Sequence, residues 1–218
     1  MTLTMQILSI WLYQVGISRV QMRLHLEQPH EVTRMIFFLL REHKAVIRYD
    51  AHEQRVKMVE IVTNHFKRFP KSFSYVQCPR SERLFLIESS TERNKVCLEL
   101  VLKEGVYVTE DRSSFKYGRM HGSVCAVNED VLVLTGGITP SSDKCEVYSV
   151  ARDEWTLEPN KLNVGRRLHG SCSFNRRLCY IFGGKSGKNH VNSIEVLDIE
   201  NRGRGWQLIN VIGYELPP

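Results

Sequence analysis

The sequence predicts an all-β protein built from about four repeated units, each with four short strands. Two observations predict this class. Glycine pairs follow two apolar runs and begin 47 residues apart, at Gly136 and Gly183. Apolar and polar residues alternate along residues 19–27 and 54–61, which is the period of a half-buried strand. Between these stretches, continuous Val, Ile, Leu and Phe runs indicate strands that are buried on both faces.

Other features recur at nearly the same spacing. The sequence Arg-Met-His-Gly-Ser at 119–123 returns as Arg-Leu-His-Gly-Ser at 167–171, 48 residues later. Glu-Val-Tyr at 146–148 returns as Glu-Val-Leu at 195–197, 49 residues later. Independent features that share one period indicate a repeated supersecondary unit.

The period continues toward the N-terminus in weaker form. The apolar run 83–87 ends at Glu88, 48 residues before Gly136, and Leu98 is matched there to the tyrosine of the third strand. The resulting organisation comprises 1–18 as the outer strand of a preceding or incomplete unit, degenerate units at 19–66 and 67–117, motif-bearing units at 118–164 and 165–213, and the truncated start of a further unit at 214–218.

The two motif-bearing units resemble the kelch repeat. Both have an Arg and a His-Gly-Ser opening, an apolar strand that ends in Gly-Gly, and a Trp in the fourth strand. The motif residues are Arg119, His121, Gly136, Gly137, Tyr148 and Trp155 in the first unit, and Arg167, His169, Gly183, Gly184 and Trp206 in the second, where Leu197 stands in place of the tyrosine.

This resemblance implies a partial β-propeller of about four four-stranded kelch-type blades. Kelch propellers close with about five to seven blades, so we expect this array to be unclosed and to self-associate through its open blade faces. The double glycines let the chain turn where backbones crowd together. We expect Tyr148, Trp155 and Trp206 to be structural and to fill the space between blades.

The resemblance also implies where a partner binds. Kelch ligand faces consist of the loops after the Gly-Gly strand and the loops that join blades, here 138–144, 185–192, 110–119 and 158–167. These loops contain few acids, and a basic rim suits an acidic peptide that Arg grips through bidentate carboxylate contacts. An open alternative is that they are simply solvated loops. The predicted partner-binding residues are Arg119, Lys144, Arg166, Arg167, Lys185, Lys188 and His190.

Composition and charge also predict the kind of partner, the state of the cysteines and the cellular compartment. The net charge of +6 is dispersed, so we expect no nucleic-acid partner. The six cysteines form no C-x-x-C pair, which predicts buried free thiols, no metal site and a reducing compartment. Residues 2–17 are uncharged but short for a membrane span, so a buried strand is favoured over a signal or anchor. We therefore expect a cytoplasmic protein without a membrane partner.

The leading functional hypothesis is a non-catalytic kelch-repeat interaction module, a scaffold or adaptor that binds a partner protein or an acidic peptide without a cofactor. One alternative is the substrate-recognition part of a ubiquitin ligase whose adaptor domain lies outside this chain. Another is a kelch-propeller enzyme, such as a copper radical oxidase or a sugar-acid isomerase. No catalytic set is identifiable, and 183–188 lacks one residue of a phosphate-binding loop.

Overall fold

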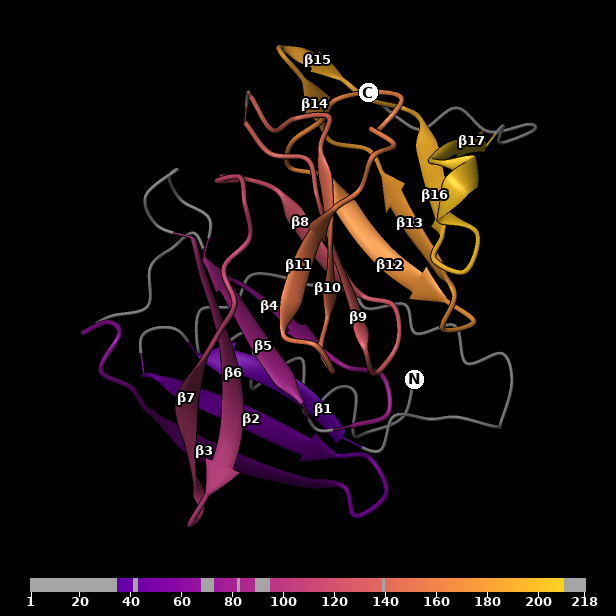
Figure 1. The fold of residues 1–218 in the computed structure, drawn as a ribbon. Helices are drawn as coiled ribbons and strands as arrows, with labels where there is room; N and C mark the ends of the chain where they lie inside the picture. The colour runs from indigo at the N-terminus through magenta and orange to yellow at the C-terminus, as the bar shows by residue number, and fades with distance from the viewer. Residues whose placement is uncertain are drawn as a thin grey trace.

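A computed structural model describes residues 35–40, 43–67, 73–81, 83–88, 95–138 and 140–209 (Figure 1). Their regular structure consists of β-strands and one short 3-10 helix, η1 (Arg202–Arg204). The predicted all-β class is therefore confirmed. The strands predicted within 1–18 and 19–27, and the unit start predicted at 214–218, lie outside the described residues.

The N-terminal half forms a seven-stranded sheet in the order β1-β2-β3-β7-β6-β5-β4. Its strands are β1 (Met35–Leu40), β2 (Ala45–Asp50), β3 (Arg55–Val62), β4 (Phe73–Gln77), β5 (Leu84–Glu88), β6 (Val96–Lys103) and β7 (Val106–Arg112). All neighbours are antiparallel except β3 and β7, which pair in parallel. The sheet curls until its edges approach, and the Gln77 side-chain amide donates to the Met35 carbonyl at 2.8 Å, which makes it nearly closed and barrel-like.

Two four-stranded antiparallel sheets follow. The first, in the order β11-β10-β9-β8, lies within 118–164, and the second, in the order β12-β13-β16-β17, lies within 165–213. The strands are β8 (Ser123–Ala126), β9 (Val131–Thr135), β10 (Cys145–Ser149), β11 (Glu154–Leu157), β12 (Gly170–Phe174), β13 (Leu178–Phe182), β16 (Ile194–Asp198) and β17 (Gln207–Ile209). A small hairpin of β14 (Lys185–Ser186) and β15 (Asn189–His190) projects between β13 and β16.

Apolar layers hold the sheets together face to face. Neighbouring residues of one strand serve different layers, because successive side chains point to opposite faces of a sheet. Leu86 of β5 packs against β1–β3, whereas Phe85 packs against β8–β11. Between the two four-stranded sheets lie Val133, Cys145, Cys179, Ile181 and Trp206, among others. This two-sided burial explains the continuous apolar runs in the sequence.

The strand register changes which residues correspond to each other in successive repeat units at two places. Tyr148 lies opposite Leu132 and Leu100 lies opposite Leu84, so the counterpart of Tyr148 in the preceding sheet is Leu100 and not Leu98. The opening motifs also shift by one residue. His121 and Leu168 share a positive φ, 64° and 56°, and lie 47 residues apart, whereas the sequence motifs at 119–123 and 167–171 lie 48 apart.

The cysteines are free thiols. Cys78, Cys97, Cys125, Cys145 and Cys179 are buried, as expected, but Cys172 is exposed. Burial raises the pKa of Cys78, Cys97 and Cys145 to about 12, so these three thiols are inert core residues.

Candidate binding face

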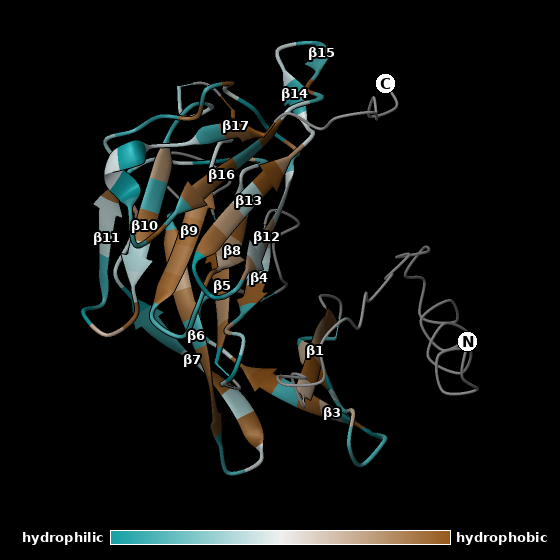
Figure 2. Cartoon of the chain, turned by 90° about the vertical axis from the view of Figure 1, so that its right-hand side faces the viewer, coloured by the Kyte–Doolittle hydropathy of each residue, from teal (hydrophilic) through white to brown (hydrophobic). Residues whose placement is uncertain are grey.

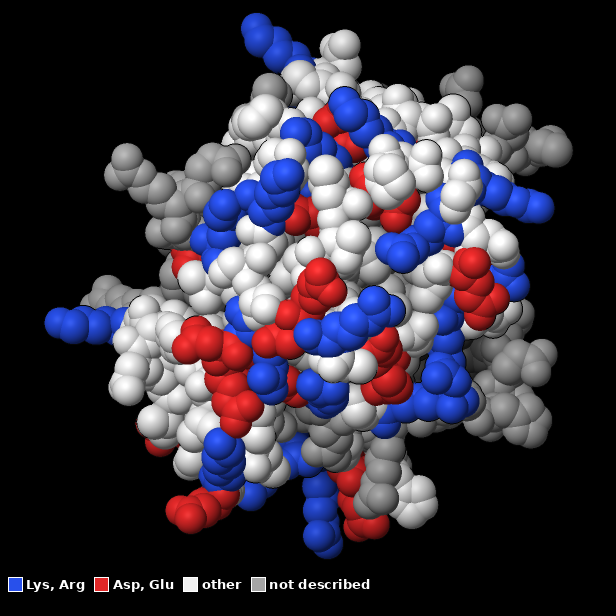
Figure 3. Space-filling model, in the orientation of Figure 1, with Lys and Arg blue, Asp and Glu red and all other residues white. Residues whose placement is uncertain are grey.

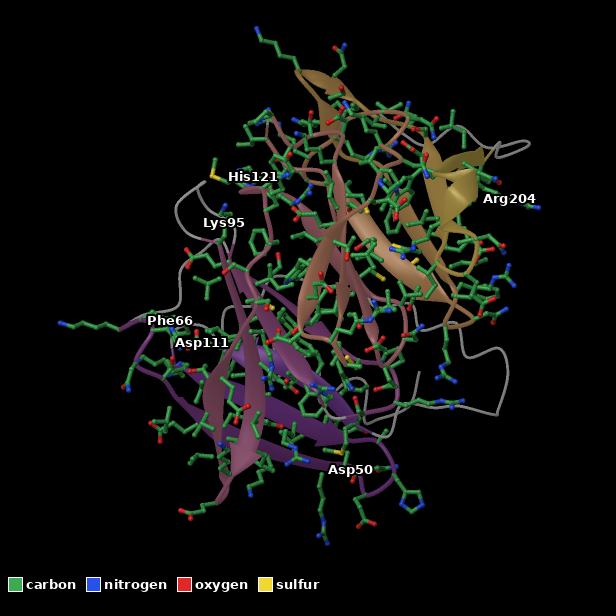
Figure 4. All side chains as sticks on the ribbon, in the orientation of Figure 1. Asp50, Phe66, Lys95, Asp111, His121 and Arg204 are labelled. Carbon is green, nitrogen blue, oxygen red and sulfur yellow. The ribbon has the colours of Figure 1, made fainter. Side chains whose placement is uncertain are left out.

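Loops from both four-stranded sheets meet at one end of the molecule, where β14 and β15 project (Figure 1). Backbone hydrogen bonds join them. The Gly137 amide donates to the Arg166 carbonyl at 2.9 Å, and the Leu168 amide donates to the His121 carbonyl at 2.8 Å. Figure 4 labels His121 in this half and Asp50 at the opposite end of the molecule. We call the end formed by segments 113–122, 136–144, 161–170 and 183–193 the loop face.

Arg119 lies beneath the loop face and is fully buried. Its guanidinium donates to the Glu146 carboxylate at 2.8 Å and to the Lys144 carbonyl at 2.7 Å. The same carboxylate accepts the backbone amides of Lys116 at 2.6 Å and Tyr117 at 3.2 Å. One carboxylate on β10 thus holds the loop that enters its own sheet.

Arg166 makes the same arrangement in the next sheet. Its guanidinium pairs with Glu195 on β16 and donates to the Ser193 carbonyl at 2.9 Å. Glu195 accepts the backbone amides of Asn163 at 2.7 Å and Val164 at 3.1 Å. Burial lowers the pKa of the Arg166 guanidinium, and the Glu195 carboxylate opposes that effect.

These two buried ion pairs correct the sequence-based assignment of Arg119 and Arg166. Both side chains are 0% exposed, so they cannot reach a partner on the rim in this structure. Basic residues are seldom fully buried unless they are paired, and the sequence offered no reason to place these two inside. We use the term staple for one buried Arg, the Glu that pairs with it and the loop amides that donate hydrogen bonds to this Glu.

Glycine allows the loops to approach so closely. A Cβ atom on Gly136 would lie 2.4 Å from the Arg166 carbonyl, and Gly136 has a φ of +61°. A Cβ on Gly184, with a φ of +89°, would lie 2.5 Å from the Arg167 carbonyl. A side chain at either position would force the neighbouring backbone apart.

Aromatic and imidazole side chains also pack beneath the loop face. Tyr148 is fully buried, donates to Asp153 at 2.6 Å and stacks on Trp155 with ring centroids 4.9 Å apart. His169 contacts the Thr135 hydroxyl at 2.8 Å. Burial, reinforced by the charges of Arg166 and Arg119, lowers the pKa of His169 to about 4, so this imidazole is neutral near pH 7.

Three predicted binding residues form a basic row on the loop face. Arg167 lies directly opposite Lys185, which lies directly opposite His190 across the β14–β15 hairpin. Residues directly opposite on antiparallel strands have Cβ atoms about 5 Å apart, on the same side of the ladder. Lys188 is exposed in the turn of the same hairpin. The structure therefore brings four of the seven predicted residues together.

The remaining predicted residue, Lys144, lies over an aromatic ring. Its ammonium nitrogen is 3.8 Å from the centroid of Tyr117, and that of Lys116 is 5.6 Å away. Two apolar side chains also reach solvent on this face, Met120 at 38% and Leu168 at 56% exposure. Sequence reasoning missed Tyr117, Met120 and Leu168, because a single apolar residue in a loop carries no periodic signal.

The loop face is positively charged. Asp143 is the only acidic residue in the four segments that form the loop face. Glu146 and Glu195 lie on the strands below it. The Lys161 ammonium pairs with Asp143 at 2.8 Å and is the main cause of its lowered pKa. On the side shown in Figure 3, Lys and Arg side chains predominate at this end, and most Asp and Glu lie farther down.

Two kinds of feature are absent from the part of the chain that the structure describes. It contains no group of three or more His, Cys, Asp or Glu side chains placed to hold a metal ion. It also contains no helix long and apolar enough to cross a membrane.

No family model matches this chain, and no curated protein matches its sequence. It is similar to a solved structure titled "Structure of YjhT", with 14% identity and a TM-score of 0.53. The match covers 77% of this chain and 52% of the other, so the chain spans about half the length of that structure. At this identity the similarity concerns the fold alone.

Proposed function

We propose that this chain is part of a kelch-type β-propeller and acts as a non-catalytic interaction module. Its loop face binds an acidic segment of a partner protein. The observation that carries this proposal is the row of Arg167, Lys185 and His190, which stand side by side on a face whose one acid is already paired.

The propeller assignment draws on how the sheets stack. Antiparallel four-stranded meanders pack face to face and direct corresponding loops to one end. The two staples and the double glycines repeat with the sheets. Stacked four-stranded sheets with periodic glycine motifs are expected of successive blades.

The basic row favours an anionic ligand for an energetic reason. Like charges that lie directly opposite on paired strands repel each other and destabilise the ladder. A carboxylate that binds between Arg167 and Lys185 relieves this repulsion and accepts bidentate hydrogen bonds from the guanidinium. Met120, Leu168 and the ring of Tyr117 offer apolar area beside the charges.

A fluorescent peptide rich in Glu and Asp provides a direct test. We expect anisotropy to rise on titration with the protein, and the affinity to fall as NaCl is raised, because screening weakens exposed charge contacts. The double variant Arg167→Glu, Lys185→Glu should lose binding at least tenfold. A control, Arg55→Glu with Lys57→Glu on β3, makes the same charge change outside the loop face and should bind normally.

Two results would contradict the proposal. Equal binding by the loop-face variant and the parent protein would exclude the basic row as the site. Equal binding of a Lys-rich peptide would show that the contact is not governed by charge.

A further inference from the structure

A buried carboxylate that belongs to neither staple lies just after β11. The backbone amide of Glu158 donates to the Cys145 carbonyl at 2.9 Å, which continues the pairing of β10 with β11 by one residue. Directly opposite residues on paired strands share a side of the sheet, and Cys145 lies in the layer between the two four-stranded sheets. Glu158 therefore points toward this junction, and its side chain is 1% exposed.

This carboxylate lacks the donors that other buried glutamates have. In the described part of the chain, Glu99, Glu146 and Glu195 each accept several hydrogen bonds from guanidinium or backbone amide groups. The Oε2 atom of Glu158 has no hydrogen-bond donor among the same residues, and its Oε1 atom accepts the Asn160 side-chain amide at 3.5 Å. A buried charge without donors is costly, so this position favours a donor that comes from outside the protein.

Arg202 of η1 faces the same carboxylate without a hydrogen bond. Its Nη1 atom lies 3.5 Å from Glu158 Oε2, and its side chain is 44% exposed. The Arg202 carbonyl accepts the Asn160 side-chain amide at 2.9 Å, which holds η1 beside the end of β11 (Figure 2). A carboxylate oxygen without a donor and a guanidinium that remains largely in solvent therefore lie side by side.

Both residues line a cavity of about 190 Å³. Its lining comes from the end of β11 with the loop that follows, residues 156–160, and from Arg202 and Gly203 of η1. Leu157 and Pro159 are exposed there and provide apolar area. A water takes up about 30 Å³ in the liquid, so the cavity has room for a small organic molecule. None of these residues belongs to the four segments of the loop face, so the cavity is a separate surface.

The two charges restrict which ligand the cavity can take. A lone ammonium group would satisfy Glu158 but would lie close to Arg202, and a lone carboxylate would meet Arg202 but lie close to Glu158. Either ligand would bring like charges together. A ligand with an ammonium and a carboxylate on neighbouring atoms avoids both repulsions.

We propose that this cavity binds a free α-amino acid with a short side chain. Its ammonium donates to Glu158 Oε2, and its carboxylate accepts hydrogen bonds from the Arg202 guanidinium, which suits a planar carboxylate. Its side chain packs against Leu157 and Pro159. The proposal goes beyond the interaction module proposed above and does not depend on it.

Saturation-transfer difference NMR of the full chain with L-alanine tests the proposal. Ethylamine and propionate are the matched ligands, because each keeps the carbon skeleton of alanine and only one of its charged groups. L-alanine should bind the parent protein. Each of the other two should bind about tenfold more weakly or less, because it loses a charge-assisted hydrogen bond.

Variants assign the two contacts separately. Glu158→Gln should weaken L-alanine binding about tenfold without weakening that of propionate, because it removes only the partner of the ammonium. Arg202→Gln should weaken L-alanine similarly without weakening ethylamine, and its exposed position makes misfolding an unlikely cause. Arg204→Gln is the control: it removes the same charge from η1, but Arg204 lies outside the cavity lining (Figure 4) and the variant should bind normally.

Three results would overturn the proposal. No binding of L-alanine to the parent protein would show that the cavity takes solvent only. Ethylamine or propionate binding as tightly as L-alanine would exclude recognition of both charged groups. Parent-like affinity of Arg202→Gln for L-alanine would exclude its guanidinium as the carboxylate partner. These measurements use no acidic peptide, so they neither support nor contradict binding at the loop face.

Discussion

Two junctions of the stack, one within the seven-stranded sheet and one between the two four-stranded sheets, are built differently. Where β1–β3 meet β4–β7, the layer is apolar, with Phe37, Val46 and Leu98 among its residues. Where β8–β11 meet the last sheet, a comparable apolar layer lies beneath a staple. Leu98 stands 48 residues before Glu146, and Ser72 stands 47 residues before Arg119. The unit 67–117 therefore has neither the Glu nor the Arg of a staple at the corresponding positions.

This difference shows what a staple adds. An apolar layer, the β3–β7 ladder and the Gln77–Met35 hydrogen bond join β1–β3 to β4–β7, so a buried ion pair is not needed there. A buried carboxylate is costly without its guanidinium, which explains why the two are present or absent together. The staple instead holds the backbone of the loop that enters its sheet.

The largest expected effect comes from breaking a staple. Glu195→Ala leaves the Arg166 guanidinium buried without its carboxylate, and loss of one member of a buried pair costs about 3–5 kcal/mol of unfolding free energy. Urea denaturation followed by tryptophan fluorescence would measure this loss. The double variant Arg166→Met, Glu195→Leu should recover part of it, because the guanidinium is removed while the Asn163 and Val164 amides still lack their acceptor. A double variant as unstable as the single one would show that the charges themselves are needed.

Leu98→Ala should weaken the unstapled junction. Leu98 is 0% exposed in the first apolar layer, and truncation of such a leucine costs about 2–5 kcal/mol through lost burial and a residual cavity. The same denaturation experiment applies. Leu102→Ala, at a 43% exposed position of the same strand, should change stability little. Equal losses at both positions would contradict the described packing.

The stapled junction should also lose stability in mild acid. The pKa of His169 falls from 6.5 to about 4 on folding, so the unfolded chain binds a proton that the folded protein rejects. Stability from this group is present above pH 6.5 and declines as pH falls toward 4, by about 3 kcal/mol at most. His169→Gln should flatten the pH dependence of the unfolding free energy over this range. His190→Gln, at an exposed position, is the control; similar profiles for both variants would exclude His169.

The smallest effect is expected from an exposed ion pair. Arg177 and Asp198 are linked like the staple residues, but their side chains are 42% and 22% exposed. Water already solvates such a pair, so its removal costs little. Arg177→Ala should leave the denaturation midpoint nearly unchanged. A loss as large as that of Glu195→Ala would show that burial does not distinguish the two pairs.

Sequence reasoning reached the all-β class because strand periodicity is local, and the paired glycines are visible in the chain. It did not predict the parallel pairing of β3 with β7, since that contact joins residues 46 apart through neither a turn nor a repeat. The recurrence of Glu146 and Glu195 was visible. Their arginine partners were assigned to the surface, because charged loop residues are usually solvated and burial depends on tertiary contacts.

The staples have a consequence for the loop face as the proposed binding surface. Four loop amides, those of Lys116, Tyr117, Asn163 and Val164, donate to carboxylates that belong to strands. These segments therefore lose their conformational entropy when the sheets fold and not when a ligand arrives. A pre-organised surface of this kind selects ligands by fit, and its amide hydrogens exchange with solvent at the pace of the sheets below.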